Sequence, residues 1–135
     1  MRKVLIPVDG SERSKIALTL ARKIFLPGEV SVKLLIVQDD SACQATLPKV
    51  PVDPYTGGTI SKMRELATMV LGYNPDVSIV YGQPGDMILE IAKSESIDLI
   101  IMTKSTKTGW TQTIGSVTSQ VVKHAPCMVL IAPEL

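Results

Sequence analysis

Hydrophobic positions along the chain fall into two patterns that alternate. Five short runs are rich in Val, Ile and Leu, and several are apolar on both faces, which is typical of buried parallel strands. These runs are 3–8, 30–37, 77–82, 98–102 and 127–132. Four segments between them have the period of an amphipathic helix, at 12–26, 59–73, 84–95 and 113–124. This alternation predicts an α/β fold with a parallel sheet and helices on both of its faces.

Each helical segment places its apolar side chains on one stripe, which we expect to face the sheet. The stripes are Ile16, Leu20 and Ile24 with Ala17, Ala21 and Phe25 beside them; Ile60, Met63, Ala67, Val70 and Leu71; Met87, Ile88, Ile91 and Ala92; and Ile114, Val117, Val121 and Val122. The connection 38–58 is rich in proline and has no stable period, so we expect an irregular surface excursion or a lid there.

The composition narrows the class of protein. The chain has 135 residues, which suits one domain spanning 1–135. Lys and Arg total 14 and Asp and Glu total 13, so the net charge of +1 gives no field that would attract nucleic acid or anionic lipid. The apolar runs are far shorter than the roughly 20 residues of a membrane span, and the apolar start is too short for a signal peptide. We therefore expect a cytoplasmic protein without a nucleic-acid or membrane partner.

The two cysteines, Cys43 and Cys127, are expected to be reduced thiols. The sequence shows neither a secretory signal nor a CxxC motif. One histidine and two separated cysteines do not form a recognisable ligand cluster, so no metal site is predicted.

Candidate chemistry lies in the turns after the strands, because ligands of open α/β sheets bind outside the carboxyl ends of the strands. Asp9 follows the first strand, and "TKSTKTGWTQTIGS" at 103–116 follows the fourth. Gly115 and Ser116 open the last helix, whose unpaired N–H groups and positive dipole end suit an anion. Asp9 would repel a phosphate, so it suits a ribose hydroxyl or an adenine edge. Neither GxxxxGK(S/T) nor GxGxxG occurs, and an ordinary solvated turn would explain the same residues.

Three blocks of the chain, in order, resemble the universal stress protein family. "KVLIPVDGSERSKIAL" is similar to the family's first strand and turn, and "VYGQPGDMILEIAKSESIDLIIM" to its third strand, helix and fourth strand. "IGSVTSQVVKHAPCMVLIAPE" is similar to its closing helix and last strand. The resemblance implies a single-domain, three-layer, Rossmann-like fold with a five-stranded parallel sheet in the order 3-2-1-4-5. In that order the first and fourth strands are neighbours, so Asp9 and the 103–116 stretch are expected to share one crevice.

Many members of the family bind ATP through G-x-x-G, nine further residues and G-(S/T). Here Thr103 and Thr106 take the first two glycine positions, and only eight residues, 107–114, precede Gly115. Threonine costs roughly 1–3 kcal/mol where a left-handed backbone is required, whereas the nearby lysines and hydroxyls offer charge-assisted contacts of about 1.5–3 kcal/mol each. ATP is the expected cofactor despite the altered glycines, with Mg²⁺ as an optional companion. The expected binding residues are Pro7, Val8, Asp9, Val37, Gly82, Met102, Thr103, Lys104, Thr106, Lys107, Gly109, Gly115, Ser116 and Val117.

Two hypotheses about function stay open. The first is a dimeric module that binds an adenine nucleotide in the stress response; the second is a nucleotide-free member that acts through dimerisation and protein partners. A phosphoacceptor receiver domain shares the sheet topology but needs an aspartate and a lysine where this chain has Tyr81-Gly82 and Ala132-Pro133. An enzyme is not expected, because no base, nucleophile and orienting residue fall at matched strand ends, and His124 suits a helix C-terminus.

The last strand, 127–132, is expected to form a homodimer interface. It is apolar throughout and, in the family's strand order, lies at an edge of the sheet. An apolar edge promotes aggregation unless it is paired. In related proteins the equivalent strand pairs with its two-fold mate, which is an isologous contact.

Overall fold

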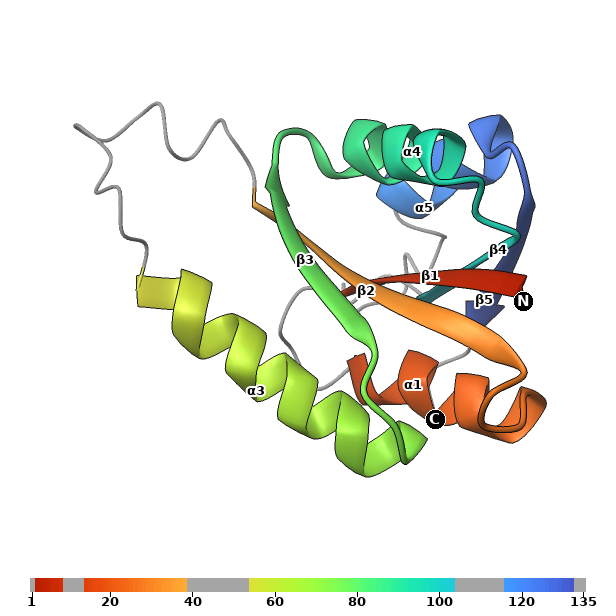
Figure 1. Cartoon of the computed structure of the whole chain (residues 1–135). Coiled ribbons are helices and arrows are strands. Elements are labelled where there is room, and N and C mark those ends of the chain that lie inside the picture. The colour runs from red at the N-terminus through yellow and green to blue at the C-terminus, as the bar shows by residue number, and fades with distance from the viewer. Residues whose placement is uncertain (1, 9–13, 39–53, 104–115, 133–135) are drawn as a thin grey trace, which may run out of the picture.

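Strands and helices alternate along the chain in the predicted order (Figure 1). The computed structural model describes residues 2–8, 14–38, 54–103 and 116–132. The strands are β1 (Arg2–Val8), β2 (Val30–Gln38), β3 (Asp76–Tyr81), β4 (Leu99–Thr103) and β5 (Met128–Ala132). The helices are α1 (Ser14–Ile24), α3 (Pro54–Leu71), α4 (Pro84–Ser94) and α5 (Ser116–His124).

The five strands form one parallel sheet in the order β3-β2-β1-β4-β5. This sheet is the middle of three layers, with α1 and α3 on one face and α4 and α5 on the other (Figure 1). The predicted fold class and the strand order that the resemblance implied are therefore confirmed.

The central strands are buried on both faces. Side chains alternate between the two faces of a strand, so on β1 Val4 and Ile6 pack with α1 and α3, whereas Leu5 packs with α4 and α5. Leu34 and Leu35 divide in the same way on β2. Burial on both sides explains why these strands are continuous apolar runs in the sequence.

The buried side of α1 is rotated relative to the predicted stripe. Ala17, Leu18 and Ala21 are buried, whereas Ile24 is 46% exposed. The buried side of α1 therefore consists of Ala17, Leu18 and Ala21. Val122 on α5 is likewise 48% exposed, although we placed it on the buried stripe. The described stripe residues of α3 and α4 are buried or half-buried, as predicted.

The predicted connection 38–58 is wrong at both ends. Gln38 is the last residue of β2, and α3 begins at Pro54, so 54–58 is helical. A proline fits the first helical turn, where its missing N–H has no partner within the helix. Two glycines, which are poor helix formers, hide this start in the sequence pattern. The remainder, 39–53, lies outside the described residues.

Charged residues tie the strands together toward their amino ends. The Lys33 ammonium, on a side chain that is 17% exposed, lies 2.7 Å from Glu95 Oε2 and 3.7 Å from Asp76 Oδ2. The Lys3 backbone N–H donates to Asp98 Oδ2 at 2.8 Å, and the Lys3 ammonium donates to the Glu95 carbonyl at 3.1 Å. These contacts join β1, β2, β3 and the turn between α4 and β4.

The helix α4 ends in a motif that normally uses glycine. Ser96 has φ 53°, the only positive φ of a non-glycine residue in the described part of the chain. The Ile97 N–H donates to the Ala92 carbonyl at 3.0 Å, and the Ser96 N–H donates to the Lys93 carbonyl at 3.4 Å. These two bonds, with Ile97 and Ala92 buried in one cluster, define a Schellman motif with serine at the left-handed position.

Ser96→Gly should raise the free energy of unfolding by about 0.5–1 kcal/mol. A left-handed residue with a Cβ costs roughly 1–2 kcal/mol, and the extra freedom of glycine in the unfolded chain returns part of that gain. Urea denaturation measures the change. Ser94→Gly, inside the last turn of the same helix, is the control and should lose about 0.5 kcal/mol. Equal destabilisation by both variants would contradict this account of the turn.

Gly82 follows β3 with φ 149°, a conformation that side chains rarely adopt. A Cβ at this position would lie 2.9 Å from Met87 Cγ and 3.0 Å from Met87 Sδ. Both the backbone and the space around it therefore require glycine.

Gly82→Ala should lower the free energy of unfolding by about 1–3 kcal/mol. Gly28→Ala is the matched control, because Gly28 has φ 87° but a Cβ added there would meet nothing within 4 Å, so only backbone strain applies. The additional variant Met87→Ala should recover part of the loss at Gly82 but none at Gly28. Equal losses at the two glycines in thermal or urea unfolding would refute the contact with Met87.

Candidate functional site

The carboxyl edge of the sheet gathers the predicted site residues that the structure describes. Pro7 and Val8 end β1, Val37 is the penultimate residue of β2, Gly82 follows β3, Met102 and Thr103 end β4, and Ser116 and Val117 begin α5. The other predicted residues, Asp9, Lys104, Thr106, Lys107, Gly109 and Gly115, lie outside the described residues.

The neighbouring strands β1 and β4 are followed by helices on different faces of the sheet. β1 leads into α1 on one face, whereas its neighbour β4 leads into α5 on the other face (Figure 1). The helices that follow these two strands therefore lie on opposite faces of the sheet. Ligands of open α/β sheets bind at such a switch point.

Pro7 limits the pairing of β1 with β4 at this point. The Lys3 carbonyl accepts the Asp98 N–H at 2.9 Å, so the backbone groups of alternate residues from Lys3 to Pro7 face β4. Proline has no N–H to donate. The pairing of β1 with β4 runs from Val4 with Leu99 to Leu5 with Ile100, whereas β1 pairs with β2 along its full length. The ladder between the two strands therefore stops before their carboxyl ends.

An apolar floor lies under this edge on the α4 and α5 face. Val37, Val80 and Val117 are half-buried and pack against the same cluster as Met102, which is 7% exposed. These four residues come from β2, β3, β4 and α5. Such a surface suits an apolar ring, such as a nucleobase, better than it suits a charged group.

The first turn of α5 supplies polar backbone N–H groups, in contrast to the apolar floor. The first N–H groups of a helix have no partner within it, and the dipole adds positive potential there. Thr103, which replaces a family glycine, is the last residue of β4 and has no positive φ. The strain that we considered for a threonine in a left-handed conformation therefore does not apply at Thr103.

A contact between α4 and α5 was not predicted from the sequence. Gln120 Nε2 donates to Asp86 Oδ1 at 2.7 Å. A Cβ at the buried Gly85 would overlap the Gln120 amide. Gln120 and Asp86 are 34 positions apart and carry no shared motif, so no sequence signal marks the contact.

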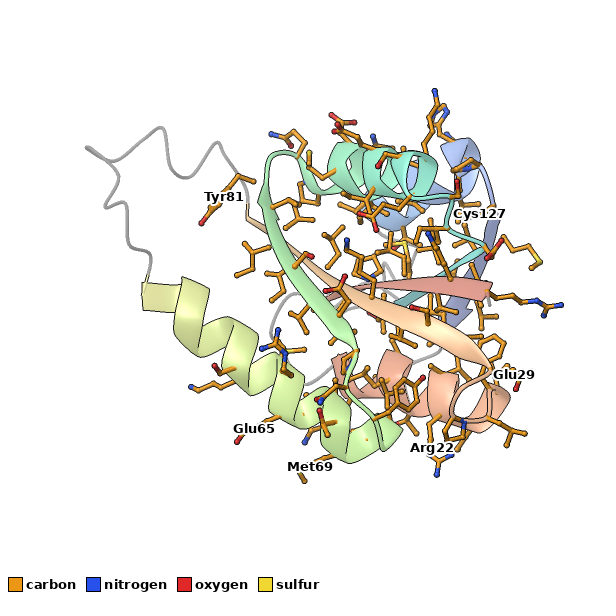
Figure 2. All side chains as sticks on the ribbon, in the orientation of Figure 1. Arg22, Glu29, Glu65, Met69, Tyr81 and Cys127 are labelled. Atoms are coloured by element: carbon orange, nitrogen blue, oxygen red, sulfur yellow. The ribbon has the colours of Figure 1, made fainter. Side chains whose placement is uncertain are left out.

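Three other polar residues do not face the predicted site as ligands would. His124 is the last residue of α5, at the opposite end of the helix from Ser116. Tyr81 is 48% exposed and points away from the sheet at the end of β3, and Cys127 lies just before β5 (Figure 2). Burial raises the pKa of the Cys127 thiol, and the charge of Asp98 raises it further. Since the thiolate is the reactive form, Cys127, a free thiol, is a poor nucleophile; Cys43 lies outside the described residues.

Neither a metal-binding cluster nor a membrane-spanning helix is found in the described part of the chain. In residues 2–8, 14–38, 54–103 and 116–132, no three His, Cys, Asp or Glu side chains are grouped so that they could hold a metal ion. Within the same ranges, no helix is both long enough and apolar enough to cross a membrane.

Three solved structures with this fold contain an adenine nucleotide. A universal stress protein in complex with cAMP is 19% identical, with TM-score 0.74 and coverage of 98% of this chain and 96% of the other. One from Archaeoglobus fulgidus with dAMP is 16% identical, with TM-score 0.67 and coverage of 98% of each. One from Arabidopsis thaliana with AMP bound is 18% identical, with TM-score 0.64 and coverage of 100% and 93%. At these identities the similarity establishes the fold alone.

Relatives of higher sequence identity are similar to this chain over nearly its whole length. Universal stress protein MJ0531 of Methanocaldococcus jannaschii is 29% identical, over 98% of this chain and 82% of that protein. The structure of hypothetical protein MJ0577 is 28% identical, with TM-score 0.78 and coverage of 99% and 96%. Universal stress protein UspA from Lactobacillus plantarum is 27% identical, with TM-score 0.74 and coverage of 97% of each chain. The model of the universal stress protein family matches residues 1–133, and the chain belongs to that family.

Proposed function

We propose that this universal stress protein binds an adenine nucleotide at the carboxyl edge between β1 and β4 and acts in the stress response as a dimeric binding or signalling module. The switch point carries the proposal. There the ends of β1 and β4 and the start of α5 meet beside the apolar floor. The nucleotides in the three structures described above support an adenine ligand.

The apolar floor and the first turn of α5 suit the base and the phosphate of a nucleotide, respectively. The apolar floor of Val37, Val80, Met102 and Val117 suits the base, with Asp9 accepting from a ribose hydroxyl or an adenine amine. The first turn of α5 suits the phosphate oxygens. Lys104 or Lys107 adds positive charge to that end, and Mg²⁺ accompanies ATP if the ligand is a triphosphate.

A second candidate function is a nucleotide-free member that works through dimerisation and protein partners. The observation that favours it is the altered glycine motif, in which Thr103 and Thr106 stand at the first two positions and the loop is one residue shorter. A side chain at such positions limits how closely the backbone approaches a phosphate.

We propose binding rather than catalysis. A general base must come within hydrogen-bond reach of the atom from which it takes a proton. His124, the only histidine in the sequence, ends α5 eight residues beyond Ser116, which is roughly 12 Å along a helix. It cannot reach a phosphate held at the other end.

Ser116→Ala should weaken AMP and ATP binding by about five- to thirty-fold, because a hydroxyl bond to a charged phosphate contributes roughly 1–2 kcal/mol. Gly115→Val should weaken both more, since its side chain blocks close approach. Asp9→Ala should weaken adenosine as well, because its role lies on the nucleoside side. Isothermal titration calorimetry with AMP, ATP and adenosine measures all three effects.

Ser94→Ala is the matched control for Ser116→Ala. Ser94 ends α4, away from the carboxyl edge, so its loss should leave every affinity unchanged. If the wild type binds none of the three ligands at millimolar concentration, the nucleotide-binding proposal is wrong and the nucleotide-free candidate takes its place.

The proposed dimer uses the outer edge of β5, which no other strand of the described chain pairs with. This strand is the last in the sheet, and Met128 at its start is 69% exposed. Val129 and Leu130 pack against the two core clusters, whereas Ile131 is half-buried and packs against neither. A partner strand would cover Ile131 and satisfy the unpaired backbone groups of the edge.

Ile131→Lys should convert the dimer to a monomer at tens of micromolar, because each two-fold contact would bury two ammonium groups. Sedimentation velocity measures the oligomeric state, and circular dichroism checks that the fold is kept. Met69→Lys is the control, because Met69 is 81% exposed on α3 and points away from the sheet (Figure 2). A wild-type monomer under these conditions would rule out the proposed interface.

A further inference from the structure

A hydrogen bond joins the first turn of α4 to the second turn of α5, near the carboxyl ends of the strands. Asp86 is the third residue of α4 and Gln120 the fifth of α5. Gln120 Nε2 donates to Asp86 Oδ1 at 2.7 Å. We infer that this bond, which Gly85 makes possible, positions the first turn of α5 and so the phosphate end of the nucleotide site. The inference rests on the function proposed above.

Gly85 leaves the space that the Gln120 amide occupies beside α4. It is buried in the first turn of α4, and a Cβ there would overlap the Gln120 amide. Any other residue must displace that amide, which is held by Asp86. Gly85 and Asp86 therefore act together: one leaves the space for the Gln120 side chain, and the other accepts its hydrogen bond.

The bond can position the start of α5 because of where Gln120 lies on the helix. Residues four apart lie on the same side of a helix, about one turn from each other, so Gln120 lies directly below Ser116. Val121, fully buried in the core cluster, fixes the distance of α5 from the sheet. The bond from Gln120 to Asp86 adds a second, lateral constraint, which limits rotation of α5 about its own axis. Together they aim the free N–H groups of the first turn.

Asp86 anchors α5 through its hydrogen bond with Gln120. It lies in the first turn of α4, where the helix dipole favours a carboxylate. The amide of Gln120 occupies one of its oxygens, so the carboxylate serves as an anchor for α5. Asp86 and Gln120 are thus positioning residues and are not proposed to touch the nucleotide.

The decisive comparison is Asp86→Leu against Asp86→Asn. Both remove the charge and keep nearly the same size, but only asparagine keeps an oxygen that accepts from Gln120. In the free protein, Asp86→Leu should speed amide hydrogen exchange in the first two turns of α5 about two- to ten-fold, and Asp86→Asn should not. AMP affinity measured by calorimetry should fall by a similar factor in Asp86→Leu alone. Adenosine affinity should stay unchanged in both.

Gly85→Ala tests the other half of the arrangement. It should weaken AMP binding about as much as Gln120→Ala does. The double variant Gly85→Ala/Gln120→Ala should be no worse than Gln120→Ala alone, because the shorter side chain removes the overlap. Glu90→Leu, one turn further along the exposed side of α4, is the control and should leave exchange and affinity unchanged.

The outcomes separate this inference from the proposed function. Equal exchange and equal AMP affinity in Asp86→Leu and Asp86→Asn would overturn the inference even if the wild type binds AMP. Faster exchange with unchanged AMP affinity would also overturn it, because α5 would then be anchored without effect on the site. A wild type that binds neither AMP nor ATP would overturn the proposed function and with it the role of the bond in ligand binding. In that case the exchange difference would still establish the anchoring of α5.

Discussion

Burial of the central strands on both faces is the constraint on which the other features of this protein depend. Leu5 and Ile100 face one helical layer, and Ile6 and Ile101 face the other, all with no exposed surface. A strand of this kind is stable only if helices cover both sides. The chain therefore has to send α1 and α3 to one face and α4 and α5 to the other. The change of face between neighbouring strands β1 and β4 creates the switch point at which we place the ligand.

Different contacts stabilise the amino ends and the carboxyl ends of the strands. Toward the amino ends, Lys33 binds Glu95 and Lys3 binds Asp98, so charged groups close the strands against each other. At the carboxyl ends, two residues matter for groups that they lack by nature. Proline at position 7 has no N–H to donate to β4, and glycine at position 85 has no Cβ that would displace the Gln120 amide. The amino ends are thereby held together by charged contacts, whereas at the carboxyl ends the pairing of β1 with β4 stops at Leu5 with Ile100.

At Thr103 the altered glycine motif causes no backbone strain. Thr103 completes β4 in an ordinary extended conformation and lies opposite Ala132 of β5. Its side chain therefore adds no backbone strain to the edge. What the motif still provides is the start of α5, and the position of that helix depends on the packing of Val121 and on the bond from Gln120 to Asp86. Contacts outside the motif thus take part in positioning the proposed phosphate end of the site.

Local patterns in the sequence were sufficient for the elements and for the family. Apolar runs and helical periods predicted every described strand and helix, because side-chain period follows directly from backbone geometry. The start of α3 at Pro54 escaped this reasoning, since two glycines weaken the local helical signal while the later turns, with Met63, Ala67 and Leu71 in the core, support the helix.

The sequence by itself also predicted which strand ends carry candidate ligand residues, because ligand sites of α/β sheets follow the chain direction of the strands. Periodicity alone could not order the strands; that order followed from family resemblance and was confirmed by the pairing. Only the tertiary structure decided that α1 buries Ala17, Leu18 and Ala21, that the pairing of β1 with β4 stops at Leu5, and that Gln120 meets Asp86 beside Gly85. Such contacts join residues that are far apart in the chain, and their partners are selected by packing distances that no local pattern encodes.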